Sequence, residues 1–321
     1  MGEDGANIVT RNSRLAFCVN GKFWVNNHAH VFKSKYSNYF LSEILESINY
    51  DKYNTGTAQP KLNAKVLRGI KIVMPEELEQ KKIASFLSAV DSKIEKLTRK
   101  KELLEEYKKG VMQKLFSGEI RFKDENGDNY PDWGTLFFGN VFERVTRKNK
   151  ENNNNIMTIS AQDGLINQKK YFNHSVSAKD VSGYYQINKD EFAYNKSYSK
   201  GYPLGAIKRL TRYDKGVLST LYICFRAKNY ESVDYLEHYF DSQVINKELY
   251  RIAQEGARNH GLLNLSVVEF FKDIQIKLPI IEEQIKIASF LNQLNSKIMK
   301  ESRLLDKTKK FKKGLLQQMF V

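Results

Sequence analysis

The stretch Lys82-Ile-Ala-Ser-Phe-Leu87 recurs unchanged as Lys286-Ile-Ala-Ser-Phe-Leu291, inside a longer duplication that decides the fold. Residues 75–117 align without a gap on residues 279–321, at a constant separation of 204 residues. That period is far longer than the roughly 20–50 residues of a solenoid repeat. Two similar segments, each following a larger unit, instead predict a pseudo-twofold molecule with two globular heads.

Both copies of the repeat have the hydrophobic spacing of a coiled coil. Apolar residues alternate at steps of four and three, and polar residues such as Lys101, Lys108 and Lys312 interrupt the series only occasionally. A period of 3.5 residues over such a length is typical of a helix–helix seam. Each helix would be about 60 Å long at 1.5 Å per residue. The predicted seam residues are Ile83, Leu87, Val90, Ile94, Leu97, Leu104, Ile287, Leu291, Leu294, Ile298, Leu305 and Leu315.

The polar residues of the seam indicate which helices pair. Lys101 in the first copy aligns with Leu305 in the second, and Glu301 in the second aligns with Leu97 in the first. Two non-identical helices packed on each other within one chain fit this pattern better than either helix packed on itself. The first helix would start near Pro75 and the second near Pro279, because proline is favoured in the first turn of a helix.

The composition favours a polyanionic partner. The 321 residues include 52 Lys and Arg against 37 Asp and Glu, a formal net charge of +15. Such an excess favours nucleic acid first and an anionic membrane surface second. No run approaches the 18 or so apolar residues of a membrane span, and the N-terminal residues lack the features of a signal peptide. Cys18 and Cys224 lie in apolar, strand-like runs, so we expect two buried, reduced thiols and a cytoplasmic protein.

The segment between the two repeats is expected to fold into a mixed domain of strands and helices. The clearest helix covers residues 232–252, and residues 267–271 form a short one. The predicted strands are residues 156–160, 191–194, 205–209 and 220–226.

Residues before the first repeat contain weaker copies of the same domain. A strand-like run at residues 21–32 precedes a predicted helix at residues 38–48, and residues 56–63 parallel residues 256–264. No counterpart of residues 133–207 precedes this segment, so the first head is expected to be incomplete.

Common catalytic signatures do not occur in the sequence. It has no Pro-Pro for an adenine-methyltransferase loop and no Gly-x4-Gly-Lys-Ser/Thr phosphate loop. Pro131-Asp132 is not followed by the Asp/Glu-x-Lys of a nuclease site, and His28-x-His30 lacks further ligands at metal spacing. We therefore expect no catalytic residue, no metal site and no cofactor in this chain.

Several loops combine basic, amide and aromatic side chains, which suits DNA binding. Lysines neutralise phosphates, whereas arginine and asparagine can read guanine and adenine edges in the major groove. A solvated turn is the alternative for each loop taken alone, but similar loops recur at matching points of both heads. The candidate DNA-binding residues are Asn27, His28, Gln59, Lys61, Lys196, Tyr198, Lys200, Tyr202, Lys208, Arg209, Arg258, Asn259 and His260.

Together these pieces resemble the DNA-specificity subunit of a type I restriction–modification system. The resemblance covers nearly the whole chain. The motifs that carry it are Pro75-Glu-Glu-Leu-Glu-Gln-Lys-Lys-Ile-Ala84, Leu115-Phe-Ser-Gly-Glu-Ile-Arg-Phe122, Tyr130-Pro-Asp-Trp133, Tyr194-Asn-Lys-Ser-Tyr198, Gly205-Ala-Ile-Lys-Arg-Leu210, Gly256-Ala-Arg-Asn-His-Gly261 and Phe270-Phe271.

The resemblance implies an α+β protein in which two long antiparallel helices separate two target-recognition domains. Each domain would read one half of a bipartite site in double-stranded DNA, and the helices would set the spacer and dock two modification (methyltransferase) subunits. Restriction (translocase-nuclease) subunits would complete the enzyme. S-adenosylmethionine, magnesium and ATP would belong to those partners.

The expected boundaries follow from the repeat. Residues 1–75 would form a partial first recognition domain, residues 76–118 the first helix, residues 119–279 the second recognition domain and residues 280–321 the second helix. Because the first domain is expected to be truncated, self-association of two copies is a further expectation. Two other classes remain open: a free-standing DNA-binding protein that dimerises through its coiled coil, and a structural coiled-coil scaffold whose basic charge is incidental.

Overall fold

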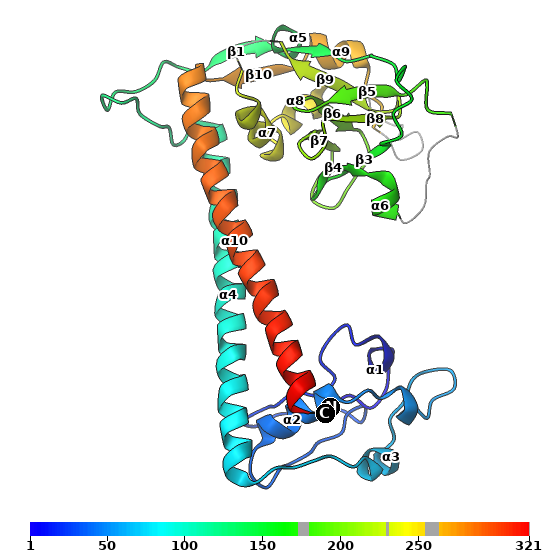
Figure 1. Cartoon of the computed structure of the whole chain (residues 1–321). Helices are drawn as coiled ribbons and strands as arrows, with labels where there is room; N and C mark the ends of the chain where they lie inside the picture. Colours follow the sequence, from blue (N-terminus) through cyan, green and yellow to red (C-terminus); the bar gives the residue numbers. More distant parts are fainter. Residues whose placement is uncertain (173–179, 229–230, 254–262, 321) are drawn as a thin grey trace. The chain divides into compact units, whose positions relative to one another are not determined.

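The computed structural model describes residues 1–172, 180–228, 231–253 and 263–320 of the chain, and it confirms the predicted mixture of helices and strands. Its two longest helices are α4 (Glu77–Ser117) and α10 (Ile281–Met319) (Figure 1). The chain divides into two compact units. Unit 1 combines Met1–Leu103 with the chain from Ile298 onward, and unit 2 comprises Leu104–Lys297. Each long helix therefore contributes one part to each unit.

The duplicated motif makes the same contact at the start of both long helices. The Gln80 side-chain amide donates to the Pro75 carbonyl at 2.7 Å, and Gln284 donates to the Pro279 carbonyl at 3.0 Å. Both glutamines are almost fully buried. Each helix starts two residues after its proline, so the prediction that the prolines occupy the first helical turn was wrong by this margin. The proline instead supplies the carbonyl oxygen that accepts a hydrogen bond from the glutamine side chain.

Unit 2 is built around antiparallel sheets, seen in the upper part of Figure 1. Its main sheet has the strand order β2-β9-β6-β7, and three two-stranded sheets pair β1 with β10, β3 with β4, and β5 with β8. The strands are β1 (Gly134–Phe137), β2 (Phe142–Arg144), β3 (Met157–Ser160), β4 (Gly164–Asn167), β5 (Tyr185–Asn188), β6 (Phe192–Asn195), β7 (Ala206–Arg209), β8 (Lys215–Leu218), β9 (Ile223–Ala227) and β10 (Gln275–Leu278).

Aromatic side chains fill the core between the main sheet and the helices of unit 2. Phe192 stacks on Phe225 with ring centroids 5.6 Å apart, and Tyr194 stacks on Phe270 at 5.5 Å. All four side chains are fully buried. Such pairs stabilise the core beyond the area they bury. The helices are α5 (Phe138–Val141), α6 (Gln168–Phe172), α7 (Val233–Asp241), α8 (Asn246–Ile252) and α9 (Val267–Lys272).

Most of the elements predicted for unit 2 are confirmed, with shifts at their ends. Strands form at β3, β6, β7 and β9, and α9 covers the short predicted helix. The single helix predicted over residues 232–252 was wrong, because the chain forms two helices there. Gln243, between α7 and α8, has a φ of 61°, a left-handed conformation that interrupts a right-handed helix.

Unit 1 is mostly helical and irregular in its described residues. Its short helices are α1 (Asn7–Thr10), α2 (Asn38–Ser47), the 3-10 turn η1 (Asp51–Tyr53) and α3 (Ala64–Gly69). Helix α2 confirms the helix predicted at residues 38–48, and the Ser37 hydroxyl caps it by accepting from the Phe40 amide. The strand predicted at residues 21–32 was wrong: the described backbone has only a single bridge there, between Ala29 and Gly2.

Within unit 1, the first part of α4 runs antiparallel to the last part of α10. Lys100 pairs with Glu301 at 2.6 Å, and Asp91 pairs with Lys312 at 2.7 Å. The residue number in α4 therefore increases as that of its partner in α10 decreases, as it must for antiparallel helices. Within unit 2, Leu115 of α4 and Leu291 of α10 share one core. The predicted seam residues are buried or half-buried throughout.

Candidate nucleic-acid interface

The loop between β6 and β7 carries the densest group of candidate DNA-binding side chains. Asn195 turns the loop by accepting from the Ser197 amide at 3.0 Å, and Ser199 and Tyr202 exchange backbone hydrogen bonds. Lys200 and Tyr198 are exposed, and Lys196 is half-buried. The loop thus presents basic and aromatic groups together, as phosphate and base contacts require.

Neighbouring elements hold this loop in place. Gln162, in the turn between β3 and β4, donates to the Lys200 carbonyl at 3.2 Å, and Gln243 donates to the Gly201 carbonyl at 2.8 Å. At the far end, Gly205 has a φ of 82°, and a Cβ there would lie 2.1 Å from the Asn195 carbonyl oxygen. Only glycine fits that position. A fixed loop loses less conformational entropy on binding a ligand.

Lys208 and Arg209 lie on β7, behind this loop, and their charges are compensated inside unit 2. The Lys208 ammonium contacts Asp241 at 2.6 Å and the Tyr202 hydroxyl at 3.3 Å. Burial alone would lower the pKa of Lys208, but Asp241 and Tyr202 outweigh it and raise that pKa.

Arg209 pairs with Asp234 at 2.7 Å and with Glu237 at 2.9 Å, and its side chain is largely buried. These contacts join β7 to α7, so both basic residues of this strand support the packing of the sheet on its helix. Tyr202 belongs to the same arrangement and is half-buried.

The candidates Arg258, Asn259 and His260 lie outside the described residues.

In unit 1, the structure brings together two candidate loops that are distant in sequence. His28 contacts Asp4 through Nδ1 at 2.7 Å, and Lys61 pairs with the adjacent Glu3 at 3.2 Å. Asn27, His28, Gln59 and Lys61 are all exposed. The N-terminal residues therefore lie between the two loops, which form one polar surface.

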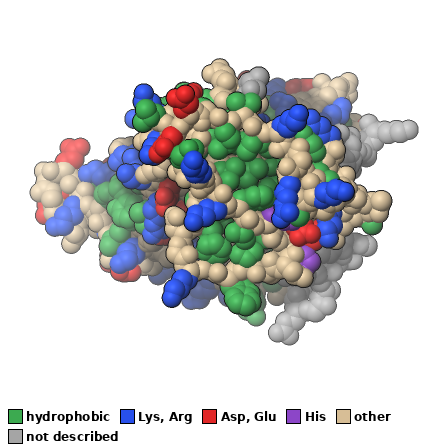
Figure 2. Space-filling view, turned by 90° about the horizontal axis from the view of Figure 1, so that it is seen from below, with side chains coloured by type: hydrophobic (Ala, Val, Ile, Leu, Met, Phe, Trp, Pro, Cys, Tyr) green, Lys and Arg blue, Asp and Glu red, His purple; other side chains and the backbone are tan. Residues whose placement is uncertain are grey.

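Helix α6 adds basic and aromatic side chains that the sequence analysis did not select. Lys169 and Lys170 are exposed, and so is much of the neighbouring Tyr171 ring. The helix follows β4, whose partner β3 leads into the turn that holds the β6–β7 loop. The run Gln168-Lys-Lys-Tyr-Phe172 resembles the selected loops in composition, and that similarity was the available signal. Figure 2, a view from below relative to Figure 1, shows one face of the molecule where hydrophobic side chains gather among lysines and arginines.

Two buried charge clusters anchor the units to the long helices. In unit 2, Glu283 is fully buried and accepts from Arg121 at 2.6 Å and from the Trp133 indole at 3.1 Å. The hydrogen bond to Glu283, which outweighs the effect of burial, raises the pKa of Arg121. Three motifs that are separate in the sequence thus converge on one carboxylate.

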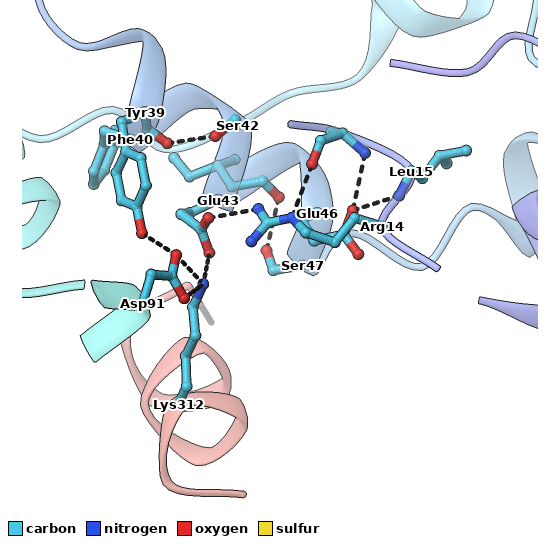
Figure 3. A network of polar contacts seen from close by, with 12 residues as sticks. Arg14, Leu15, Tyr39, Phe40, Ser42, Glu43, Glu46, Ser47, Asp91 and Lys312 are labelled. Carbon is cyan, nitrogen blue, oxygen red and sulfur yellow. Dashed lines mark hydrogen bonds and ion pairs between the residues drawn. The ribbon is translucent and has the colours of Figure 1, made fainter. Parts of the chain in front are cut away.

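In unit 1, Lys312 of α10 lies between Asp91 of α4 and Glu43 of α2, at 2.7 Å and 3.0 Å (Figure 3). Arg14 contacts the other oxygen of Glu43 at 2.5 Å, and Tyr39 donates to Asp91 at 2.5 Å. Helix α2 is therefore fastened to both long helices through one compensated cluster.

Among the described residues, no cluster of three or more His, Cys, Asp or Glu side chains is arranged to hold a metal ion. In the same part of the chain, no helix is long and apolar enough to cross a membrane.

Comparison with known proteins agrees with this architecture. Residues 15–106 match the family model of the type I restriction modification DNA specificity domain. The type I restriction enzyme MjaVIII specificity subunit of Methanocaldococcus jannaschii is 39% identical over 101 residues, which cover 30% of this chain and 24% of that protein. A putative type I restriction enzyme specificity subunit of Haemophilus influenzae is 26% identical over 307 residues, covering 92% of this chain and 74% of its own length.

The fold is shared with a solved structure. The S subunit of a type I restriction–modification system from M. genitalium matches with a TM-score of 0.51 and 16% identity, covering 88% of this chain and 72% of that one. The chain is thus similar to type I restriction–modification specificity subunits, in residues 15–106 by the family model and over most of its length by the Haemophilus influenzae relative. The match to the MjaVIII subunit spans about a quarter of that protein's length.

Proposed function

We propose that this chain recognises DNA sequence and confers target specificity on a type I restriction–modification complex. The observation that carries the proposal is the match of residues 15–106 to the DNA specificity domain of such systems. The net charge of +15 supports a polyanionic partner. The supported β6–β7 loop offers a second reading surface in unit 2.

Within that function, positioning and reading fall to different side chains. Lys196 and Lys200, with Lys169 and Lys170 of α6, neutralise phosphates and fix the protein on the duplex. Tyr198 and the polar loops of unit 1 contact bases, together with the segment that contains Arg258. Lys208 and Arg209 act indirectly, because their charges are already paired with carboxylates.

The chain itself is proposed to be non-catalytic. Two modification subunits, which transfer the methyl group, dock on α4 and α10, and restriction subunits join them. This assignment gives the exposed sides of both helices a function: Phe86 on α4 and Phe311 on α10 are each about half exposed. Apolar side chains exposed on paired helices are suited to receive further helices.

A methylation experiment tests the proposal. The chain is co-expressed with the modification subunit of its own system in a methylation-free host, and N6-methyladenine is mapped by single-molecule sequencing. A bipartite motif that depends on this chain is the expected result. If no stable complex forms, the docking assignment fails. A stable complex without sequence-specific methylation would contradict the proposal that this chain recognises the DNA sequence.

The experiment also separates the proposal from a free-standing DNA-binding protein. Such a protein would bind one sequence tightly without a modification subunit. The family match does not favour that alternative.

A further inference from the structure

The C-terminal part of α10, drawn in red in Figure 1, carries a row of basic side chains along one face. They recur at steps of three and four residues, so they lie above one another on the helix. All of them are exposed, and all belong to unit 1. The row spans about 20 Å at 1.5 Å per residue. This basic stripe consists of Lys300, Arg303, Lys307, Lys310 and Lys313.

The basic stripe faces away from α4. Thr308 and Lys312 are buried, and Lys312 contacts Asp91 of α4 at 2.7 Å, so this side of α10 faces the helix pair. Lys310 is two residues from both Thr308 and Lys312, which places it about 160° from either around the helix axis. Its ammonium group therefore points to solvent.

The charges of the basic stripe are not compensated by the described residues. No carboxylate in that part of the chain forms an ion pair with the stripe, and this includes Asp306, which lies next to it in the sequence. In α4, by contrast, Arg99 occupies the position equivalent to Arg303 and pairs with Glu102 at 3.5 Å. Like charges four residues apart, such as Arg303 and Lys307, destabilise a helix. The stripe therefore costs stability, and a structural role does not explain it.

The internal repeat shows that the long helices do not require this charge. Asp306–Lys313 contains five lysines and one aspartate, whereas the aligned residues Glu102–Lys109 of α4 contain two lysines and three glutamates. Both segments are helical throughout. The excess of positive charge is thus a property of α10 alone.

The repeat also shows that this face of a long helix stays open when a globular domain is attached. Glu106 and Lys109 of α4 are the equivalents of Lys310 and Lys313, and both belong to unit 2. They are exposed beside the sheets and helices of that unit. The exposure of the stripe therefore follows from its position on the helix.

We propose that the basic stripe of α10 binds the phosphate backbone of duplex DNA. The inference rests on the proposed function and adds a contact surface away from the base-reading loops. Double-stranded DNA carries one negative charge per about 1.7 Å of its axis, so a row of cations about 20 Å long meets several phosphates. Lysine and arginine contacts to phosphates fix a protein on the duplex without reading its sequence. The stripe thus adds affinity for any sequence and makes that affinity dependent on salt.

The repeat supplies the variant that tests the proposal. Lys307→Leu with Lys310→Glu gives α10 the residues that α4 has at Leu103 and Glu106, so the helix content and melting temperature should not fall. Fluorescence anisotropy with duplex DNA of random sequence is measured over a salt series. The slope of log affinity against log salt should become shallower by about 1.8, which is about 0.9 for each of two phosphate contacts.

A matched control separates local contact from a general effect of charge. Lys310→Glu alone should make the slope shallower by about 0.9. Lys109→Glu causes the same change in net charge at the equivalent, exposed position of α4, and it should leave the slope unchanged. Because the stripe contacts no bases, all of these variants should preserve the methylated motif.

The outcomes distinguish this proposal from the proposed function. An unaltered slope in the double variant would overturn the assignment of the stripe to DNA and leave sequence recognition standing, and so would an equal change in Lys109→Glu. Failure of the unchanged chain to bind duplex DNA would overturn both proposals. If the double variant instead assembles more weakly with the modification subunit at an unchanged slope, the stripe is a protein contact and the proposal is wrong.

Discussion

Arg121 and Glu283, which are 162 residues apart in the chain, form a two-point ion pair inside unit 2. Arg121 follows the first long helix, and Glu283 lies in the first turn of the second. The ion pair therefore connects the two ends of the chain segment that contains the sheets of unit 2. Trp133 donates to the same carboxylate. A buried carboxylate with two donors is costly to disturb, because removing its charge leaves the guanidinium with the more distant and fully exposed carboxylate of Asp132, 3.6 Å away.

Glu283→Gln is therefore expected to destabilise unit 2 by about 2–3 kcal/mol. Urea denaturation followed by tryptophan fluorescence measures the change. The internal repeat supplies the control, since Glu79 occupies the equivalent position in α4 and is exposed. Glu79→Gln should change stability by less than about 0.5 kcal/mol. Equal effects of the two variants would contradict the anchoring role of Glu283.

Lys312→Met is expected to destabilise unit 1 by about 2 kcal/mol, because Asp91 and Glu43 both lose their shared cation. Hydrogen exchange should show faster opening of α2 and of the last turns of α10. The neighbouring Lys313 is exposed, so Lys313→Met is the matched control and should be neutral. Because Asp91 contacts Lys312 directly, Lys312→Met and Asp91→Asn together should cost less than the sum of the single changes.

Salt dependence distinguishes phosphate contacts from structural lysines. If Lys196 and Lys200 contact phosphates, replacing either with alanine should reduce the slope of log affinity against log salt by about 0.9 per contact. Fluorescence anisotropy with duplex DNA over a salt series measures this slope. Lys277→Ala, at an exposed position on β10, is the control. An unchanged slope in both loop variants would place the DNA elsewhere.

His238 should make the stability of unit 2 depend on pH. Burial lowers the pKa of this imidazole, against the opposing effect of its contact with Asn292 at 2.8 Å. The unfolded chain therefore binds a proton at higher pH than the folded chain. Stability should fall as the pH drops through 6.5, the usual pKa of histidine. His238→Gln should flatten this dependence below about pH 7, as measured by urea denaturation.

The two cysteines should react at very different rates. The Cys224 side chain is buried in β9, and burial raises the pKa of its thiol to about 12. Cys18, predicted to be buried, is instead half-buried and lines the groove beside α2. A thiol reagent should therefore modify one cysteine of the native protein quickly and the second only on unfolding. Cys18→Ser should abolish the fast phase.

The repeat predicted the helical part of the fold well, because a seam is encoded locally. Leu87 and Leu291 occupy identical positions of two similar sequences, and both are completely buried. The strands β6 and β9 could also be located, because each contains a continuous run of apolar and aromatic residues. Exposed strands such as β1 carried no such signal, since pairing with β10 and not burial defines them.

The candidate site was less accessible from sequence. The composition of a loop indicated basic and aromatic groups at Lys200 and Lys208 alike. The two lysines differ because Lys208 is paired with Asp241. Asp241 is a residue of α7, and its position depends on the packing of the sheet. The strand expected at residues 21–32 failed for a similar reason, because a strand requires a partner and the sequence does not state whether one is present.

The sharing of both long helices between the units has a consequence for synthesis. The contact between Asp91 and Lys312 can form only after the ribosome has added Lys312, 221 residues later. Phe40 likewise packs against Phe320, with ring centroids 5.4 Å apart. Although it is translated first, the N-terminal unit is the one that can be completed only at the end. The exposed apolar side chains of unit 1, such as Trp24, must therefore remain protected from aggregation while the whole of unit 2 emerges and folds.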